Sequence, residues 1–254
     1  MKIYAIAKNT FKEVIRDRIF YSLVFFALLI LGASVLLSAL TIGERTKIIE
    51  DISLAGINLF GVVISIFVGI GLVSKELEKK TIYTIVSKPI SRWEFLLGKY
   101  MGLAMTLLVY VALMSGCFLG ALYLDTRAWG GLLMPAVLMI YFELLIVTAA
   151  ALLFSTFSTP TLSATYTLAV YVIGHLTGDL KGLAGRIGNP ALAKTLEALY
   201  YILPNLEDFN LKGQVVHGQS VPAGIMLMSM SYGLLYVIVI LALAMIVFQR
   251  RNFK

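Results

Sequence analysis

The run "GLLMPAVLMIYFELLIVTAAALLF", residues 131–154, is 24 residues long and contains no Lys, Arg, His or Asp and a single Glu, Glu143. A helix rises about 1.5 Å per residue, so this run would be about 36 Å long, enough to cross the roughly 30 Å hydrocarbon core of a bilayer. A stretch this long and this apolar predicts a transmembrane helix.

Five further apolar runs lie on either side of it, at 19–42, 52–74, 100–124, 161–178 and 223–248. Of the six, 161–178 is the shortest. The chain is 59% hydrophobic and only 14% charged, whereas a soluble domain needs about 25% charged residues. We therefore expect an all-α integral membrane protein with six transmembrane helices in one domain, 1–254.

Lysine and arginine counts predict the orientation of these helices. With both termini inside, the inner segments 1–18, 75–99, 155–160 and 249–254 carry 14 of the 21 Lys and Arg residues, and the outer segments carry 7. Basic residues gather on the cytoplasmic side of membrane proteins, so we expect cytoplasmic N- and C-termini. The same placement explains the net charge of +7 without a nucleic-acid partner.

The first 18 residues predict an N-terminal helix in the membrane interface, in contact with lipid. Its apolar face would carry Tyr4, Ala7, Phe11 and Ile15, beside a basic row of Lys8, Lys12 and Arg16. A basic topology signal without fixed structure is the alternative.

One long charged segment, 75–95, separates the second and third apolar runs, and it holds five Lys or Arg and three Glu residues. Ser91 and Glu94 have the spacing of a capping box, which predicts that the third helix begins near Ser91. Pro89 helps to stop whatever precedes it.

Within this segment, Thr81–Val86 predicts a turn and a half of helix with Ile82, Ile85 and Val86 at helical spacing. So short a helix is not stable alone in water. Its apolar side therefore needs lipid or a groove on a soluble partner.

These residues resemble the permease subunits of type-2 ABC transporters, the exporter class with six spans per subunit. The matching positions are Glu76, Glu78, Thr81, Lys88-Pro89-Ile90-Ser91-Arg92 and Gly98-Lys99. Lys80 departs from the common version, which has glycine just before the threonine, so the start of the short helix stays open. The order of helices and loops extends the resemblance to nearly the whole chain.

The resemblance implies a transport subunit, not an enzyme, in the cytoplasmic membrane of a prokaryote. It implies that a coupling helix docks into a separate ATP-hydrolysing ABC subunit, that two copies of the permease form a homodimer, and that the substrate is exported. The coupling residues would be Glu76, Glu78, Thr81, Ile82, Tyr83, Ile85, Val86, Pro89, Ser91 and Arg92. A solvated topology loop is the alternative.

ATP chemistry is missing from this sequence. Gly98-Lys99 is followed by Tyr100 where a phosphate-binding loop has Ser or Thr, and Trp93 stands where its first glycine belongs. We expect no cofactor on this chain, and ATP with magnesium on the partner subunit. The single cysteine, Cys117, excludes an intrachain disulfide and a Cys-rich zinc site.

Two glycine pairs in the third run, Gly98 with Gly102 and Gly116 with Gly120, predict close helix packing. The pairs are 18 residues apart, which is five helical turns, so they share one face. A dimer seam and an internal neighbour are equally open as partners.

Glu143 is the candidate polar residue of the pathway. An ionised carboxylate at that depth costs about 3 kcal/mol, so it should face the protein or a wet cavity. A place on the substrate path, a proton-sensitive gate, and a structural bond to a neighbour such as Asn58 all remain open. We expect His175 to bond locally to Asp179 rather than to bind metal, and Met226, Met228 and Met230 to serve packing rather than copper binding.

The outer segment 179–222 contains the pattern of an amphipathic helix that starts at Pro190 and carries Leu192, Leu196, Leu199 and Leu203. We expect it on the outer membrane surface with Tyr200 and Tyr201 at headgroup level. An exit gate, a dock for an outer partner protein and a cover over the dimer are all open.

Two other classes of function compete with the transport subunit. An intramembrane protease would need a Ser–His pair, paired metal-binding histidines or clustered acids within the spans, and this chain does not supply them. An inverted repeat or a broken pair of spans would indicate an ATP-independent secondary transporter or a membrane scaffold, and neither is evident in the sequence.

Overall fold

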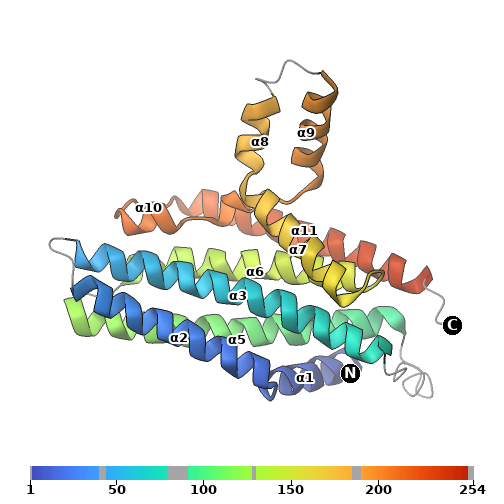
Figure 1. The fold of residues 1–254 in the computed structure, drawn as a ribbon, viewed down its shortest axis with the longest axis horizontal. Helices are drawn as coiled ribbons and strands as arrows, with labels where there is room; N and C mark the ends of the chain where they lie inside the picture. Colours follow the sequence, from blue (N-terminus) through green and yellow to red (C-terminus); the bar gives the residue numbers. More distant parts are fainter. Residues whose placement is uncertain (1, 40–43, 79–90, 128–129, 185–189, 251–254) are drawn as a thin grey trace.

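The computed structural model describes residues 2–39, 44–78, 91–127, 130–184 and 190–250, and within these ranges the regular structure is helical (Figure 1). The α-helices are α1 (Lys2–Ile15), α2 (Arg18–Ala39), α3 (Arg45–Glu78), α5 (Arg92–Thr126), α6 (Met134–Ser155), α7 (Pro160–His175), α8 (Thr177–Ala184), α9 (Pro190–Ile202), α10 (Lys212–Val216) and α11 (Ala223–Arg250), with two 3-10 turns, η1 (Gly131–Leu133) and η2 (Glu207–Phe209).

Five of the described helices are long and apolar enough to cross a membrane: α2, α3, α5, α6 and α11. The sixth expected span, 161–178, is not one continuous crossing. Its helix, α7, has 16 residues and is therefore about 24 Å long, short of a hydrocarbon core of about 30 Å. The chain is thus a multi-pass membrane protein with five continuous spans among its described residues.

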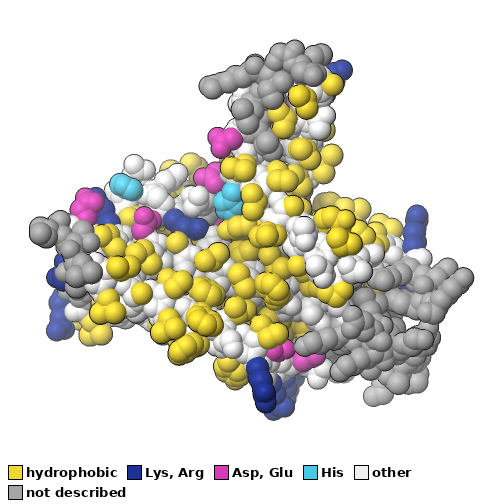
Figure 2. All heavy atoms as spheres, viewed as in Figure 1, with side chains coloured by type: hydrophobic (Ala, Val, Ile, Leu, Met, Phe, Trp, Pro, Cys, Tyr) yellow, Lys and Arg dark blue, Asp and Glu magenta, His cyan; other side chains and the backbone are white. Residues whose placement is uncertain are grey.

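Helix α6 is the centre of the bundle, with α3, α5, α7 and α11 packed around it. Most of its side chains are buried, including those of Ile140, Leu144 and Leu152 at 0% exposure. The outer helices instead expose large apolar side chains, such as Phe25 on α2 and Ile238 on α11. Figure 2 shows the resulting mostly hydrophobic face along the bundle, which lipid rather than water would cover.

Both described ends of the chain lie at one end of this bundle, which we call the termini end (Figure 1). The last turns of α3 and the first turn of α5 lie there too. The segment 79–90 that joins them is outside the described residues. Cytoplasmic placement of this end remains a prediction.

Helix α1 runs along α5 and buries Ala7, Thr10 and Val14. This is a different face from the predicted apolar one, with which it shares only Ala7. Tyr4 is 67% exposed. One side of α1 therefore packs against α5. Contact of the other apolar side chains of α1 with lipid stays a prediction.

Candidate functional site

Helix α7 ends inside the bundle, and polar residues lie around its end. Helix α7 stops at His175, beside the middle of α6, and the chain then turns through Leu176 into α8. The hairpin of α8 and α9 stands out from the bundle (Figure 1), and η2 and α10 then return to pack against α6. Backbone that leaves a helix at membrane depth needs partners from the protein itself.

Those partners are present at the break. The carbonyl oxygen of Gly174 accepts from the Leu206 amide at 2.9 Å. The Thr177 hydroxyl has both the Gly174 oxygen, at 3.0 Å, and Asn205 Oδ1, at 2.7 Å, within reach. The backbone amide of Asn205 donates to the Tyr232 hydroxyl at 3.0 Å. The break is thus held by specific bonds.

Only glycine fits at position 174, where the 203–216 segment crosses the end of α7. A Cβ atom on Gly174 would lie 2.8 Å from Leu206 Cγ and 2.9 Å from the Pro204 carbonyl oxygen. Both distances are far shorter than a van der Waals contact. The close approach lets the 203–216 segment pass directly over the end of α7.

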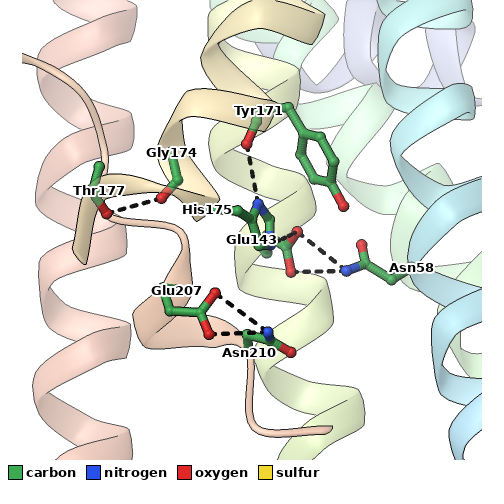
Figure 3. A network of polar contacts seen from close by, with 8 residues as sticks. All are labelled: Asn58, Glu143, Tyr171, Gly174, His175, Thr177, Glu207 and Asn210. Atoms are coloured by element: carbon green, nitrogen blue, oxygen red, sulfur yellow. Dashed lines mark hydrogen bonds and ion pairs between the residues drawn. The ribbon is translucent and has the colours of Figure 1, made fainter. Parts of the chain in front are cut away.

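Glu143 lies beside this break and is fully buried. Figure 3 shows its carboxylate between Asn58 of α3 and His175 of α7. The Asn58 amide nitrogen donates toward both carboxylate oxygens, at 3.3 and 3.2 Å, and His175 Nε2 lies 3.5 Å from Oε1. Of the alternatives left open for Glu143, the structure contains the bond to Asn58, while a role of either residue in transport is untested.

The expected bond between His175 and Asp179 is wrong. The helix breaks at Leu176, so these two residues belong to different helices and no longer share a face. His175 Nδ1 instead donates to the Tyr171 carbonyl oxygen at 3.1 Å, and Nε2 faces Glu143. Among the described residues no group of three potential ligands is suited to a metal ion.

Charged groups from the returning segment complete the site. Burial lowers the pKa of the Lys212 ammonium, and the carboxyl groups of Glu143, Glu207 and Asp51 oppose that shift. Glu207 in turn accepts from the Asn210 amide nitrogen at 3.2 and 3.3 Å. Residues far apart in the sequence therefore converge on Glu143, and only the shortness of the fifth apolar run and its late His175 hinted at this.

A second cluster joins three helices at the termini end. The predicted capping box is confirmed: the Ser91 amide donates to Glu94 at 2.9 Å as α5 begins. Arg92 Nη1 then donates to the carbonyl oxygens of Phe248 and Gln249, at 3.1 and 3.0 Å, in the last turn of α11.

About two turns further along, α5 contacts α1. Lys99, which is 2% exposed, lies 3.4 Å from Glu13. Gly98 packs against Ile6 and Gly102 against Thr10. The first glycine pair therefore has an internal neighbour, α1. Gly116 and Gly120 have no atom within 4 Å of a Cβ position.

The remaining predicted coupling residues lie in or beside the undescribed segment. Thr81, Ile82, Tyr83, Ile85, Val86 and Pro89 are outside the described residues, and Glu76 and Glu78 belong to the last turns of α3. The structure thus describes the helical backbone on either side of the predicted coupling segment.

A bundle of continuous apolar helices defines a polytopic membrane protein. The family model for the ABC-2 family transporter protein matches residues 4–253, so the chain belongs to this family. It is the membrane permease subunit of an ABC transporter, a class that works with an ATPase partner. A comparison with curated proteins gave no match.

Proposed function

We propose that this chain forms the substrate pathway of an exporter, and that a separate ATPase drives it by gripping Thr81–Val86. The observation that carries this proposal is the junction at the start of α5. Within its first eight residues, α5 contacts α11 through Arg92 and α1 through Lys99. A displacement of the loop would therefore reach three helices at once, as coupling requires.

The assay is ATP hydrolysis by the purified complex in lipid vesicles. Ile82→Asp and Ile85→Asp are expected to abolish stimulation of the ATPase, because a charge would prevent docking in an apolar groove. Insertion into the membrane should be unchanged, since the segment lies between spans. If both variants stimulate the ATPase normally, the docking assignment is wrong.

The permease is expected to work as a homodimer, since ABC machines have two membrane halves. The open face at Gly116 and Gly120 is suited to close packing with a second copy. Gly116→Leu with Gly120→Leu should convert the purified dimer to monomers, measured by native mass spectrometry. Gly32→Leu on α2, where a Cβ also meets nothing within 4 Å, is the matched control and should leave the mass unchanged.

The broken span favours a second candidate, an ATP-independent secondary transporter. Such proteins place polar groups where a helix is interrupted at mid-membrane, and α7 ends beside Glu143. Vesicles that contain only this chain, without nucleotide, separate the two functions. The exporter requires that no transport occurs until the ATPase and ATP are added.

A further inference from the structure

Helix α1 has an apolar side that α5 does not cover. The residues that α1 buries, on the side of α5, are Ala7, Thr10 and Val14. A helix turns by about 100° per residue, so a second group of apolar side chains lies about a quarter turn round from them. We call this group the apolar strip: Tyr4, Phe11 and Ile15. Tyr4 is exposed and the other two are half-buried, so the strip still offers apolar surface to a partner.

A row of three cations adjoins this strip on the side away from α5. We call it the basic row: Lys8 and Lys12 of α1, and Arg16 in the turn after it, all exposed and spaced by four residues. In the described part of the chain, none of the three belongs to an ion pair. The acidic residue of α1, Glu13, is paired with Lys99 of α5. The basic row therefore has three positive charges without a counter-charge from the described chain.

The contact with α5 places α1 at the boundary of the membrane. The span of α5 that contains this contact, Arg92–Leu124, has 33 residues and is therefore about 50 Å long. The hydrocarbon core is about 30 Å thick, so a centred span extends about 10 Å, or about seven residues, beyond it at each end. Gly98 and Gly102, which pack against α1, thus lie where hydrocarbon and headgroups meet.

We infer that the apolar strip and the basic row of α1 bind an anionic phospholipid of the surrounding membrane. Its phosphate accepts hydrogen bonds from the ammonium and guanidinium groups, while an acyl chain covers the strip. The phosphate of a zwitterionic lipid already has a cation within its own headgroup, so the uncompensated charge of the row favours a lipid with net negative charge. Figure 2 shows Lys and Arg side chains at the edge of the hydrophobic face, where α1 meets α2.

An acidic surface on a soluble protein would match the charges of the row but would leave the apolar strip unexplained. Tyr4, at 67% exposure, lies beside the row on a helix at the membrane boundary, where acyl chains and phosphates are both within reach. Lipid accounts for both features with one partner. The inference rests on the described side chains of α1 and does not depend on the proposed ATPase or on the substrate.

The experiment is native mass spectrometry of the full-length protein in a non-ionic detergent, titrated with dioleoyl phosphatidylglycerol or dioleoyl phosphatidylcholine. These lipids share their acyl chains and differ in net charge. The protein should retain a first phosphatidylglycerol at a concentration where it retains no phosphatidylcholine. The combined variant Lys8→Gln, Lys12→Gln and Arg16→Gln should weaken retention of that lipid by about tenfold or more. Lys8→Arg, Lys12→Arg and Arg16→Lys together keep the charges and should keep the lipid.

The matched control removes three basic residues from the opposite end of the bundle (Figure 1): Arg45→Gln, Lys47→Gln and Arg127→Gln. It loses the same charge and should still retain the first phosphatidylglycerol. Excess inorganic phosphate should not displace this lipid, because phosphate cannot cover the apolar strip. Displacement would indicate a site for a free anion and would contradict the inference.

Three other results overturn the inference: equal retention of the two lipids by the unmodified protein, unchanged retention of phosphatidylglycerol by the glutamine variant of the basic row, or an equal loss in the control. A row variant that keeps the lipid but no longer binds the ATPase subunit would identify the row as a protein-docking surface instead. The comparison of the two lipids on the unmodified protein needs no variant, so it stands even if a variant fails to fold.

Discussion

Gly102 of α5 lies against Thr10 of α1 so closely that a Cβ atom on the glycine would be 2.6 Å from Thr10 Cβ. The Ala7 carbonyl oxygen, at 2.7 Å from the same position, belongs to backbone and cannot rotate away. The absence of a side chain at Gly102 therefore allows α1 to lie flat along α5.

Gly102→Leu is expected to push α1 off α5, at a cost of about 1–3 kcal/mol for overpacking. Trypsin should then cut faster at Lys8 and Lys12, two exposed lysines within α1, measured by mass spectrometry of the fragments. Gly32→Leu on α2, where a Cβ meets nothing within 4 Å, is the control and should leave the cutting rate unchanged. Equal rates in the two variants would contradict this packing.

The ion pair of Lys99 and Glu13 predicts an asymmetric response to mutation. Lys99 is 2% exposed and Glu13 is 43% exposed. Glu13→Gln removes a carboxylate from the buried Lys99 ammonium and should destabilise by about 1–2 kcal/mol, less than for a fully buried pair. Lys99→Met removes the buried charge and leaves a carboxylate that water can reach, so the loss should be smaller.

The measurement is thermal unfolding in detergent, with the exposed pair Glu44–Lys47 as the reference. That pair is closer, at 2.7 Å, but both side chains are exposed, and Glu44→Gln should produce no measurable change. If Lys99→Met destabilises as much as Glu13→Gln, packing of the lysine stem rather than its charge dominates, and the prediction fails.

Arg92 is expected to transmit motion more than it stabilises the fold. It is an exposed side chain at the start of α5, and its bonds to two carbonyl oxygens at the end of α11 are worth about 0.3–1 kcal/mol. Arg92→Gln should therefore shift the unfolding temperature little while it strongly lowers transport-coupled ATP hydrolysis. Because the Arg92 bonds between α5 and α11 would then be lost, ATP turnover without transport should rise in proportion.

Arg250→Gln provides the control for charge. Arg250 is exposed in the last turn of the same helix, α11, and its loss changes the net charge equally. It should leave coupling intact. Equal coupling defects in the two variants would show that coupling depends on positive charge at the termini end and not on the bonds between Arg92 and α11.

Sequence patterns predicted some of this architecture well, because they are local. Apolar runs of sufficient length identified five continuous spans, and the spacing of Ser91 and Glu94 predicted where α5 begins. Glycine spacing predicted close packing along α5, but it could not predict that α1 would pack against Gly98 and Gly102 and not against Gly116 and Gly120.

The break after His175 escaped prediction because the apolar run continues through it. What ends α7 is tertiary: the Leu206 amide bonds to the Gly174 oxygen, and these residues are 32 positions apart. The pairing of His175 with Glu143 escaped for the same reason, since an unbroken helix would have kept His175 near Asp179. Long-range contacts of this kind leave no periodic signal in a single sequence.

The close contact between Gly174 and the 203–216 segment also allows a direct test of the end of α7. Gly174→Ala is expected to destabilise by about 1–3 kcal/mol, because its Cβ would overlap both the Leu206 side chain and the Pro204 carbonyl oxygen. The Leu206 amide should lose its bond to the Gly174 oxygen, so hydrogen exchange measured by mass spectrometry should speed up in 203–216. Gly178→Ala, four residues later on α8 with nothing within 4 Å of its Cβ, should leave exchange there unchanged. If both variants exchange alike, the 203–216 segment does not cross α7 at Gly174, and the polar site around Glu143 is not closed by it.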